Sequence, residues 1–245
     1  MSAERRKLVV ALDGPASSGK SSVGAAAALE LGYRFCDTGL LYRAVTWLGL
    51  RERVDPAGGS AAVAELVQLA DEVHLAPDAQ GRLDRVVVNG RDVTDEVHTA
   101  PVDEKVSDVS AIPEVRAALQ PRQRALAREG GIIMAGRDIG TVILPDADLK
   151  IFLDASVEER GRRRAEERGV EANSQEGQAI LAQLRRRDDL DRNRPVAPLR
   201  AASDAHVLRT DGNRFDHTVA MVVREILEAE RTATVAGASA SRRSE

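Results

Sequence analysis

Short apolar runs and helical stretches alternate at the start of the chain. Leu8–Leu12 (LVVAL) is a β-branched apolar run stopped by an Asp-Gly-Pro sequence, which predicts a strand buried on both faces. A helical stretch follows over Lys20–Leu31 and is ended by Gly32, a residue typical of helix C-termini. Tyr33–Cys36 predicts a second short strand, and a second helix begins near Leu40. This order of elements predicts a parallel α/β fold.

The middle of the chain follows a different pattern. Residues 71–97 alternate between apolar and polar positions, and Arg85–Val93 (RVVVNGRDV) places Asn89-Gly90 between two strand-like runs. An Asn-Gly pair there is a strong hairpin signal, because both residues tolerate left-handed backbone angles. The pattern therefore predicts antiparallel strands inserted into a parallel fold.

The second half of the chain returns to core strands and helices. Three further strands are predicted at Gly131–Ala135, Leu149–Leu153 and His206–Arg209. The predicted helices are Ser110–Arg128, a helix from the capping box of Ser156 and Glu159 to about Gly169, Gln175–Arg192 and His217–Arg231. Residues 1–7 and the small, polar, aperiodic tail 232–245 are expected to be disordered.

The composition narrows the class of protein. Hydrophobic residues make up 43% of the chain and charged residues 30%, and no apolar run approaches the ~20 residues of a membrane-spanning helix. The N-terminal stretch lacks the features of a signal peptide, so we expect a cytoplasmic protein with no membrane partner. With a net charge of -4 and 2% aromatic residues, a surface that stacks single-stranded nucleic acid is not expected.

The cysteine and the histidines of this chain do not indicate a nucleophile or a metal site. Cys36 is the only cysteine, and its place at the end of an apolar run indicates a buried thiol rather than a nucleophile. The four histidines, at positions 74, 98, 206 and 217, are scattered without ligand spacing. We therefore expect no structural metal.

The first strand and the first helix are joined by a complete phosphate-binding loop, or P-loop. The sequence GPASSGKS matches G-x-x-x-x-G-K-[ST], in which the glycines let backbone N–H groups and the helix N-terminus surround a phosphate. Lys20 adds a charge between the β- and γ-phosphates, and the Ser21 hydroxyl is placed to ligate Mg²⁺. We expect the donor nucleotide to contact Gly14, Pro15, Ala16, Ser17, Ser18, Gly19, Lys20, Ser21 and Ser22.

Three classes of P-loop protein compete for this sequence. A GTP-dependent switch usually carries Asn-Lys-x-Asp, but no asparagine of this chain precedes a lysine. A remodelling ATPase usually has a strand ending in adjacent acidic residues, whereas the strand before Gly136 leads into Arg137-Asp138. A small-molecule kinase needs a second anionic pocket and a way to exclude water, and this chain offers candidates for both.

Charged residues at two strand ends are the first candidates for that second pocket. Thr38 and Arg43 follow the second strand, where ligands sit in open parallel sheets, and Thr38 is also placed to cap the next helix. Arg137 and Asp138 follow another central strand. An ion pair that only ties loops together remains an alternative reading of Arg137-Asp138.

The third candidate is the charge cluster RRRDDLDRNRP at residues 185–195. On a helix, Arg187, Asp191 and Arg194 share one face. A solvated ladder of ion pairs would look similar, and Arg185, Arg186, Asp188 and Asp189 are open to that reading. Because a phosphate site is already predicted, we favour a role for the first group in closing over phosphates.

Four stretches, in this order and spacing, resemble the bacterial cytidylate kinases. They are DGPASSGKSS, DTGLLYRA, GRDIGT followed by PDADLKIFLDASVEER, and RRDDLDRNRPVAPL, and the resemblance runs from Leu8 to about Arg231. It implies one P-loop NTPase-type domain over residues 8–231, with a five-stranded parallel sheet flanked by helices. It also implies an antiparallel monophosphate-binding insertion at about 60–115 and a helical lid at about 156–198.

The resemblance further implies transfer of the γ-phosphoryl group of ATP, with Mg²⁺, to CMP or dCMP in a monomer. The acceptor phosphate would be held by Arg43, Arg137 and Arg194. The cytosine edge would be read by Ser107, Arg116 and Asp138, and the ribose would be surrounded by Tyr42, Arg187 and Asp191. Thr38 completes the acceptor set, and catalysis is assigned to Lys20, Arg137, Arg187 and Arg194.

Two positions depart from the family's pattern. Ala135 stands where the family often has an aspartate, and Ala16 begins an Ala-Ser-Ser stretch where a serine or other small residues are common. A kinase of another monophosphate or of a small alcohol, and a non-catalytic ATP or GTP switch, remain the alternatives.

Overall fold

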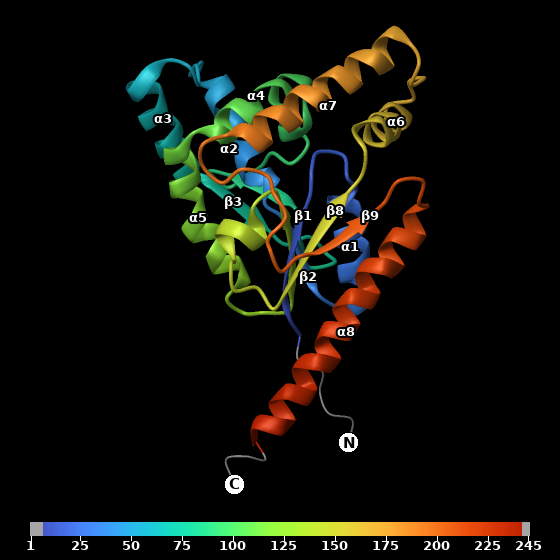
Figure 1. Cartoon of the computed structure of the whole chain (residues 1–245). Coiled ribbons are helices and arrows are strands. Elements are labelled where there is room, and N and C mark those ends of the chain that lie inside the picture. Colours follow the sequence, from blue (N-terminus) through green and yellow to red (C-terminus); the bar gives the residue numbers. More distant parts are fainter. Residues whose placement is uncertain (1–6, 242–245) are drawn as a thin grey trace.

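A single parallel sheet organises the molecule. The computed structural model describes residues 7–241, with side chains up to residue 235, and its main sheet has the strand order β4-β2-β7-β1-β8-β9 (Figure 1). The strands are β1 (Val9–Asp13), β2 (Arg34–Asp37), β4 (Arg82–Leu83), β7 (Ile132–Gly136), β8 (Leu149–Asp154) and β9 (His206–Arg209). The five predicted parallel strands are confirmed, and the two-residue β4 from the middle of the chain adds a sixth at one edge.

Helices cover both faces of this sheet. Helices α1 (Lys20–Leu31) and α8 (Phe215–Ser241) pack on one face, where Val10 and Leu12 of β1 join their apolar side chains. Ala11 points to the opposite face, which α5 (Pro113–Ala127) helps to cover. Burial on both faces explains the unbroken apolar run of β1.

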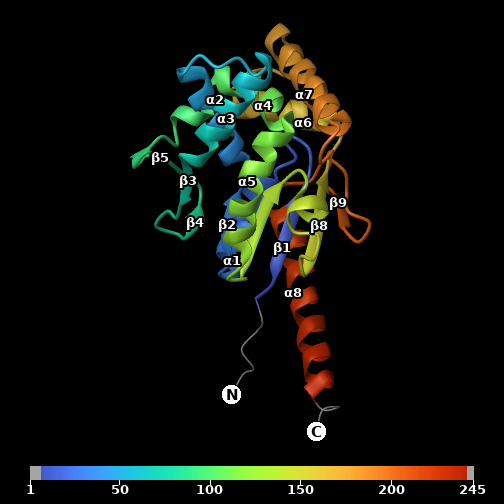
Figure 2. The same cartoon turned by 90° about the vertical axis from the view of Figure 1, so that its left-hand side faces the viewer.

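The predicted hairpin forms in a separate small sheet. Strand β5 (Arg85–Val88) pairs antiparallel with β3 (Val73–Ala76) and with β6 (Arg91–Asp92), and the turn between β5 and β6 has positive φ at both Asn89 (50°) and Gly90 (78°). Those angles are the ones that two-residue hairpin turns require. The sheet lies to one side of the main sheet, beside helices α2 (Gly39–Arg51) and α3 (Gly59–Asp71) (Figure 2).

Two helices of the middle region differ from the prediction. In place of one helix from Ser110, α4 (Ala100–Ala111) and α5 are separated at Ile112, which is extended (φ -71°, ψ 118°). Residues before proline disfavour the helical region, and Pro113 follows. Helix α3 was not predicted, although its buried Leu66 and Ala70 stand at helical spacing.

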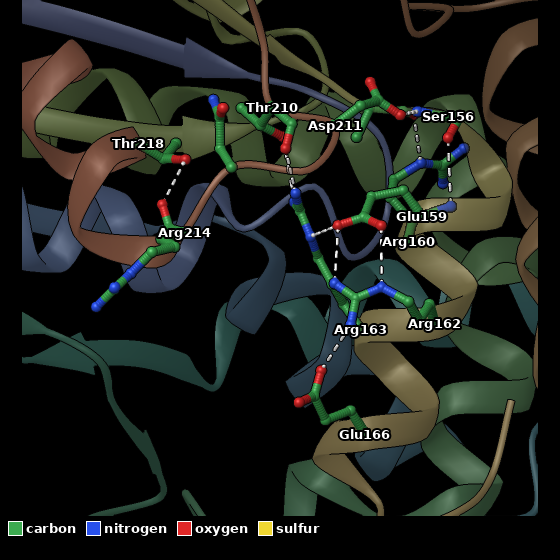
Figure 3. Close-up of polar contacts among 12 residues, drawn as sticks. Ser156, Glu159, Arg160, Arg162, Arg163, Glu166, Thr210, Asp211, Arg214 and Thr218 are labelled. Atoms are coloured by element: carbon green, nitrogen blue, oxygen red, sulfur yellow. Dashed lines mark hydrogen bonds and ion pairs between the residues drawn. The ribbon is translucent and has the colours of Figure 1, made fainter.

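The segment expected to form a lid consists of α6 (Val157–Glu167) and α7 (Gln175–Asn193), which stand above the carboxyl ends of the strands in Figure 1. The Ser156 hydroxyl accepts the Glu159 N–H, as predicted for a helix cap. The reciprocal half of the capping box does not form, because the Ser156 N–H donates to Asp211 Oδ1. The Glu159 carboxylate instead pairs with Arg163, which also donates to Thr210 (Figure 3). These contacts fix the base of α6 to the loop after β9.

The C-terminal tail differs in part from the disorder predicted for it, whereas the disorder predicted for residues 1–7 falls almost entirely outside the described residues. Helix α8 continues to Ser241, so the prediction of a helix end near Arg231 is wrong; alanine favours propagation of a helix that has already formed. Lys7 donates to Gly32 O, while residues 1–6 and 242–245 lie outside the described part. Among the described helices, none is long and apolar enough to cross a membrane.

Candidate active site

The carboxyl ends of β1, β2, β7 and β8 meet at one edge of the sheet, as in all parallel sheets. A cavity of about 850 Å³ opens there. The loop after β1, the start of α2, helix α4, the residues after β7, and the facing sides of α6 and α7 contribute to its walls. Charged groups from distant parts of the chain therefore share one enclosed space.

The P-loop forms the floor of this cavity. A Cβ at Gly14 would lie 2.3 Å from Leu153 O, so only glycine allows this close approach to β8. Gly19 has φ 88° at the point where the chain turns into α1, an angle that glycine adopts without strain. The loop is thus fixed against the sheet, with the N-terminus of α1 directed at the cavity.

Lys20 is buried at the start of α1 and donates to Pro15 O (3.0 Å). Burial, followed by the positive charge of Arg137, lowers its pKa well below the usual range. A lysine whose charge is disfavoured in this way gains strongly from an anion beside it. The cavity floor is therefore suited to phosphate.

Ser21 and Asp37 bring two oxygen ligands together beside Lys20. The Ser21 hydroxyl donates to Asp37 Oδ2 (2.5 Å), and Asp37 Oδ1 accepts the Gly39 N–H (2.9 Å). A hydroxyl and a carboxylate are hard oxygen donors, the kind that Mg²⁺ prefers, and the pair lines the cavity. These residues therefore fit a magnesium ion.

Arg137, Asp191 and Arg187 form the wall opposite the P-loop. Arg137 Nε pairs with Asp191 Oδ2 (2.9 Å). Burial would raise the pKa of Asp191, but Arg137 and Arg187 more than offset it, and the pKa lies below the usual range. Burial, and then Arg137, lower the pKa of Arg187 to about 10. Arg187 Nε is buried without a hydrogen-bond partner among the described residues, so this cation is set up for an anion that enters the cavity.

A second group of side chains is centred on Asp138. Arg116 Nη2 pairs with Asp138 Oδ2 (2.5 Å), and Arg194 Nη2 reaches Asp138 Oδ1 (3.3 Å). The Arg116 guanidinium lies 5.2 Å from the centre of the Tyr42 ring, and the buried Ser107 lines the same part of the cavity. This wall combines hydrogen-bond donors and acceptors in fixed positions, as recognition of a polar ring edge requires.

The structure places the predicted acceptor residues around one cavity. Its walls include Thr38, Tyr42, Arg43, Ser107, Arg116, Arg137, Asp138, Arg187, Asp191 and Arg194. The predicted P-loop residues that line it are Ala16, Ser17, Gly19, Lys20, Ser21 and Ser22, whereas Gly14, Pro15 and Ser18 do not reach its surface. The assigned roles of these residues stay predictions.

The expected capping role of Thr38 is wrong. Thr38 is the N-cap residue of α2, but its hydroxyl makes no cap hydrogen bond and donates to Ala135 O (2.9 Å). The N-terminus of α2 is instead capped by the carboxylate of Asp37. Thr38 thus ties α2 to β7, the strand that carries Arg137.

Several residues of the site were missed from the sequence. Asp37 is the first residue of the DTGLLYRA stretch but was given no role, although its position at a strand end was a usable signal. His98 and Asp103 also line the cavity, and no local pattern marks them. Arg160, fully buried in α6, donates to Ala16 O of the P-loop (3.0 Å) and pairs with Asp188. The reading of Asp188 as solvated is therefore wrong.

Comparison with known proteins adds an independent finding. The family model described as cytidylate kinase matches residues 10–231. A cytidylate kinase of an Exiguobacterium species is 42% identical over 91% of this chain and 98% of its own length. The cytidylate kinase of Mycobacterium avium is 45% identical over 91% and 95%, and that of Herpetosiphon aurantiacus is 47% identical over 83% and 87%.

Proposed function

The chain belongs to the cytidylate kinase family, and we propose that it transfers the γ-phosphoryl group of ATP to CMP or dCMP, giving CDP or dCDP. One observation carries the proposal. The P-loop and the arginines that were matched to a monophosphate acceptor line the same cavity of about 850 Å³, and Lys20 lies close enough to Arg137 and Arg187 for their charges to lower its pKa. Donor and acceptor phosphates can therefore meet within one enclosed space.

The transfer requires no protein nucleophile, because the acceptor is already a phosphate anion. Catalysis then consists of positioning and of neutralising charge on the transferring group. We assign donor phosphates to Lys20 and acceptor phosphate to Arg43, Arg137 and Arg194. Arg187, whose Nε is buried without a partner among the described residues, would contact the transferring group.

Magnesium is proposed as the ion that accompanies ATP. Ser21 and Asp37 would hold it, directly or through water, because they place two oxygen donors beside Lys20. When bound, Mg²⁺ would supply positive charge that neutralises the charge developing on the transferring group. The protein's own contribution is to keep the hydroxyl and the carboxylate together at the end of β2 and the start of α1.

The pyrimidine would be read by the wall around Asp138. The carboxylate is held by Arg116 and Arg194, so its position is fixed before a base enters. A carboxylate accepts from an amino group, whereas the carbonyl oxygen of uracil at the same place would meet a second acceptor. The pocket should therefore favour cytosine over uracil, and Asp191 and Tyr42 are proposed to contact the sugar.

A coupled assay of ADP release across CMP, dCMP, UMP, AMP, GMP and shikimate tests the proposed function. We expect turnover with CMP and dCMP at least about 100-fold above the other acceptors in kcat/KM, since a site built for hydrogen bonds rejects mismatched groups strongly. Preference for another acceptor would reassign the substrate. Absence of turnover with every acceptor would favour a non-catalytic nucleotide switch.

The cellular setting is also part of the proposal. We propose a cytoplasmic monomer that binds nucleotides and neither nucleic acid nor a membrane. The net charge of -4 and the 2% aromatic content support the exclusion of a nucleic-acid partner. Light scattering of the purified protein at micromolar concentration tests the oligomeric state, and a dimer mass would contradict the proposal.

A further inference from the structure

Asp103 of α4 pairs with three arginines at the rim of the cavity, and the proposed reaction assigns it no role. Its Oδ1 lies 2.5 Å from Arg43 Nη2. Its Oδ2 lies 3.4 Å from Arg164 Nη2 and 3.4 Å from Arg168 Nη2. The Asp103 side chain is 12% exposed, so the carboxylate itself is mostly shielded from water. One side chain of α4 thus joins groups from two other helical segments, α2 and the end of α6.

The three partners of Asp103 belong to different functional regions. Arg43 lies on α2 and is proposed to hold the acceptor phosphate. Arg164 lies in the last turn of α6, and Arg168 is the residue that ends that helix in the proposed lid. Within residues 7–241, the hydrogen bonds and ion pairs that join α4 to this end of α6 all run through Asp103. The end of α6 is therefore connected to Arg43 and α4 through a single carboxylate, whereas α7 contacts the acceptor residues through its own pairs.

We propose that Asp103 is a positioning residue that couples closure of the lid to the acceptor-phosphate wall. The inference rests on the proposed kinase function and adds a residue to it. One carboxylate oxygen holds Arg43 in place, and the other receives the lid arginines when the lid is closed. Asp103 acts through these arginines and contacts neither nucleotide.

The two sides of the cluster differ in strength. The pair with Arg43 is short, and Arg43 is only 15% exposed. The lid pairs are longer, and Arg164 and Arg168 are 34% and 38% exposed. Arg164 also pairs with Glu167 of its own helix (3.1 Å), so it keeps a partner if it leaves Asp103. When the lid opens, the contacts of Arg164 and Arg168 with Asp103 therefore break before the pair between Asp103 and Arg43. Arg43 then stays in position for the acceptor phosphate.

The negative charge of Asp103 has a second effect on the reaction. A carboxylate near the phosphates repels them, so replacing it with an amide, whose oxygen still accepts from Arg43, does not weaken nucleotide binding by itself. Loss of the lid contacts, however, slows formation of the closed state in which transfer occurs. Removing the charge should therefore lower kcat and leave the KM for CMP unchanged or lower. A residue that only maintained the fold would not separate kcat from KM in this way.

Amide hydrogen exchange of the nucleotide-free protein tests the connection directly. In Asp103→Asn we expect faster exchange over residues 164–174 than in the unmodified protein, because the end of α6 has lost its contact with α4. Glu166→Gln is the matched control, since Glu166 is an exposed acid on the same helix and, among the described residues, its ion pair is with Arg162 (3.0 Å). Equal exchange in Asp103→Asn and Glu166→Gln would overturn the proposal. This measurement remains informative even if the unmodified protein does not phosphorylate CMP.

Steady-state kinetics test the coupling to the reaction. For Asp103→Asn we expect kcat to fall about 3- to 10-fold, the effect that one or two partly exposed ion pairs can have, with no rise in the KM for CMP. Asp103→Glu should restore most of the loss. Combining Asp103→Asn with Arg168→Gln should slow the reaction no further than the first change alone, whereas additive losses would contradict a shared contact. If Asp103→Asn does not fold, Arg168→Gln is measured in its place. It must then show the same fall in kcat and the same faster amide exchange over residues 164–174, relative to the unmodified protein.

Discussion

Arg116 and Asp138 form an ion pair with an Nη2–Oδ2 distance of 2.5 Å, although they come from different elements, α5 and the turn after β7. Their side chains are only 7% and 6% exposed. Arg194 engages the second oxygen of Asp138 at 3.3 Å. The proposed base-reading wall is thus assembled before a nucleotide binds, and each of its charges has a fixed partner.

Replacing Asp138 should therefore affect both stability and specificity. Asp138→Asn leaves two buried arginines without their counter-charge, and we expect a loss of about 3 kcal/mol in the free energy of unfolding. The preference for CMP over UMP should fall as well, because an amide can both donate and accept. Urea denaturation and the ratio of kcat/KM values measure the two effects. Glu96→Gln, which breaks an exposed pair with Arg91, is the control and should change neither.

Replacing Arg187 should separate stability from activity. Its Nε is buried without a partner among the described residues, and burial together with Arg137 lowers its pKa to about 10. Arg187→Met keeps the volume and removes a poorly compensated cation, so the nucleotide-free protein should be as stable as before or more so, by up to about 2 kcal/mol. We expect kcat to fall about 10²- to 10³-fold, since preorganised charge at the transferring group is lost.

The outcome for Arg187 is judged against a neighbour on the same helix. Arg185 is 56% exposed and pairs with the exposed Glu158 (3.0 Å). Arg185→Met should alter neither the melting temperature nor kcat appreciably. Activity of Arg187→Met close to that of Arg185→Met would exclude the role proposed for Arg187.

Asp13, at the end of β1, should give the stability of the protein an unusual pH dependence. Burial raises the pKa of this carboxyl to about 6, although its oxygens accept the Ile139 and Gly140 N–H groups at 2.8 Å each. The folded state therefore binds the proton more tightly than the unfolded chain, whose aspartate titrates near pH 4. The stability that this proton contributes is fully present below about pH 4 and is lost as the pH rises through about 6.

Comparison with Asp13→Asn isolates this contribution. The stability of the unmodified protein relative to the variant should decline by about 3 kcal/mol between pH 4 and pH 7, which follows from a difference of about two pKa units. Urea denaturation at several pH values measures it, with the two proteins compared at each pH. A constant difference across this range would show that Asp13 is not protonated more readily in the folded state.

The sequence predicted those features of the site that depend on local geometry. The P-loop and the Arg137-Asp138 pair follow strands directly, and parallel strands bring their carboxyl ends together whatever the rest of the fold does. Helical spacing also placed Arg187 and Asp191 on one face of α7, and both line the cavity; Arg194 lines it as well, although it follows the end of the helix with extended backbone. Motif and periodicity were sufficient for these residues because their neighbours are set by secondary structure.

Other features depend on contacts between distant segments, which spacing does not reveal. Asp103 has its partners on α2 and at the end of α6, and nothing around it in the sequence indicates that both of those segments reach α4. Periodicity shows which face a residue occupies, but not what packs against that face. The length of α8 was missed for a related reason, because a small polar tail carries no periodic signal even when alanine lets the helix continue.

Because spacing does not show what packs against a residue, neighbours in one charge run can have different surroundings. Asp188 and Asp189, adjacent acids in the run at residues 185–195, allow a direct test. Asp188 is 8% exposed and pairs with Arg160, whose guanidinium also donates to Ala16 O and Ala155 O, whereas Asp189 is exposed. Asp188→Asn leaves the Arg160 charge buried and unpaired, and we expect a loss of about 3 kcal/mol in the free energy of unfolding. Asp189→Asn should change it by less than about 0.5 kcal/mol.

The Asp188 variant should also affect the donor site. Arg160 holds the P-loop through Ala16 O, so a displaced guanidinium loosens that backbone, and the KM for ATP should rise while the KM for CMP changes less. Arg160→Met combined with Asp188→Leu should recover the lost stability, because a buried ion pair can be replaced by apolar side chains of similar volume. It should not recover the KM for ATP, since Ala16 O still lacks its donor. If Asp188→Asn and Asp189→Asn had the same stability and the same KM for ATP, the buried pair would not support the P-loop.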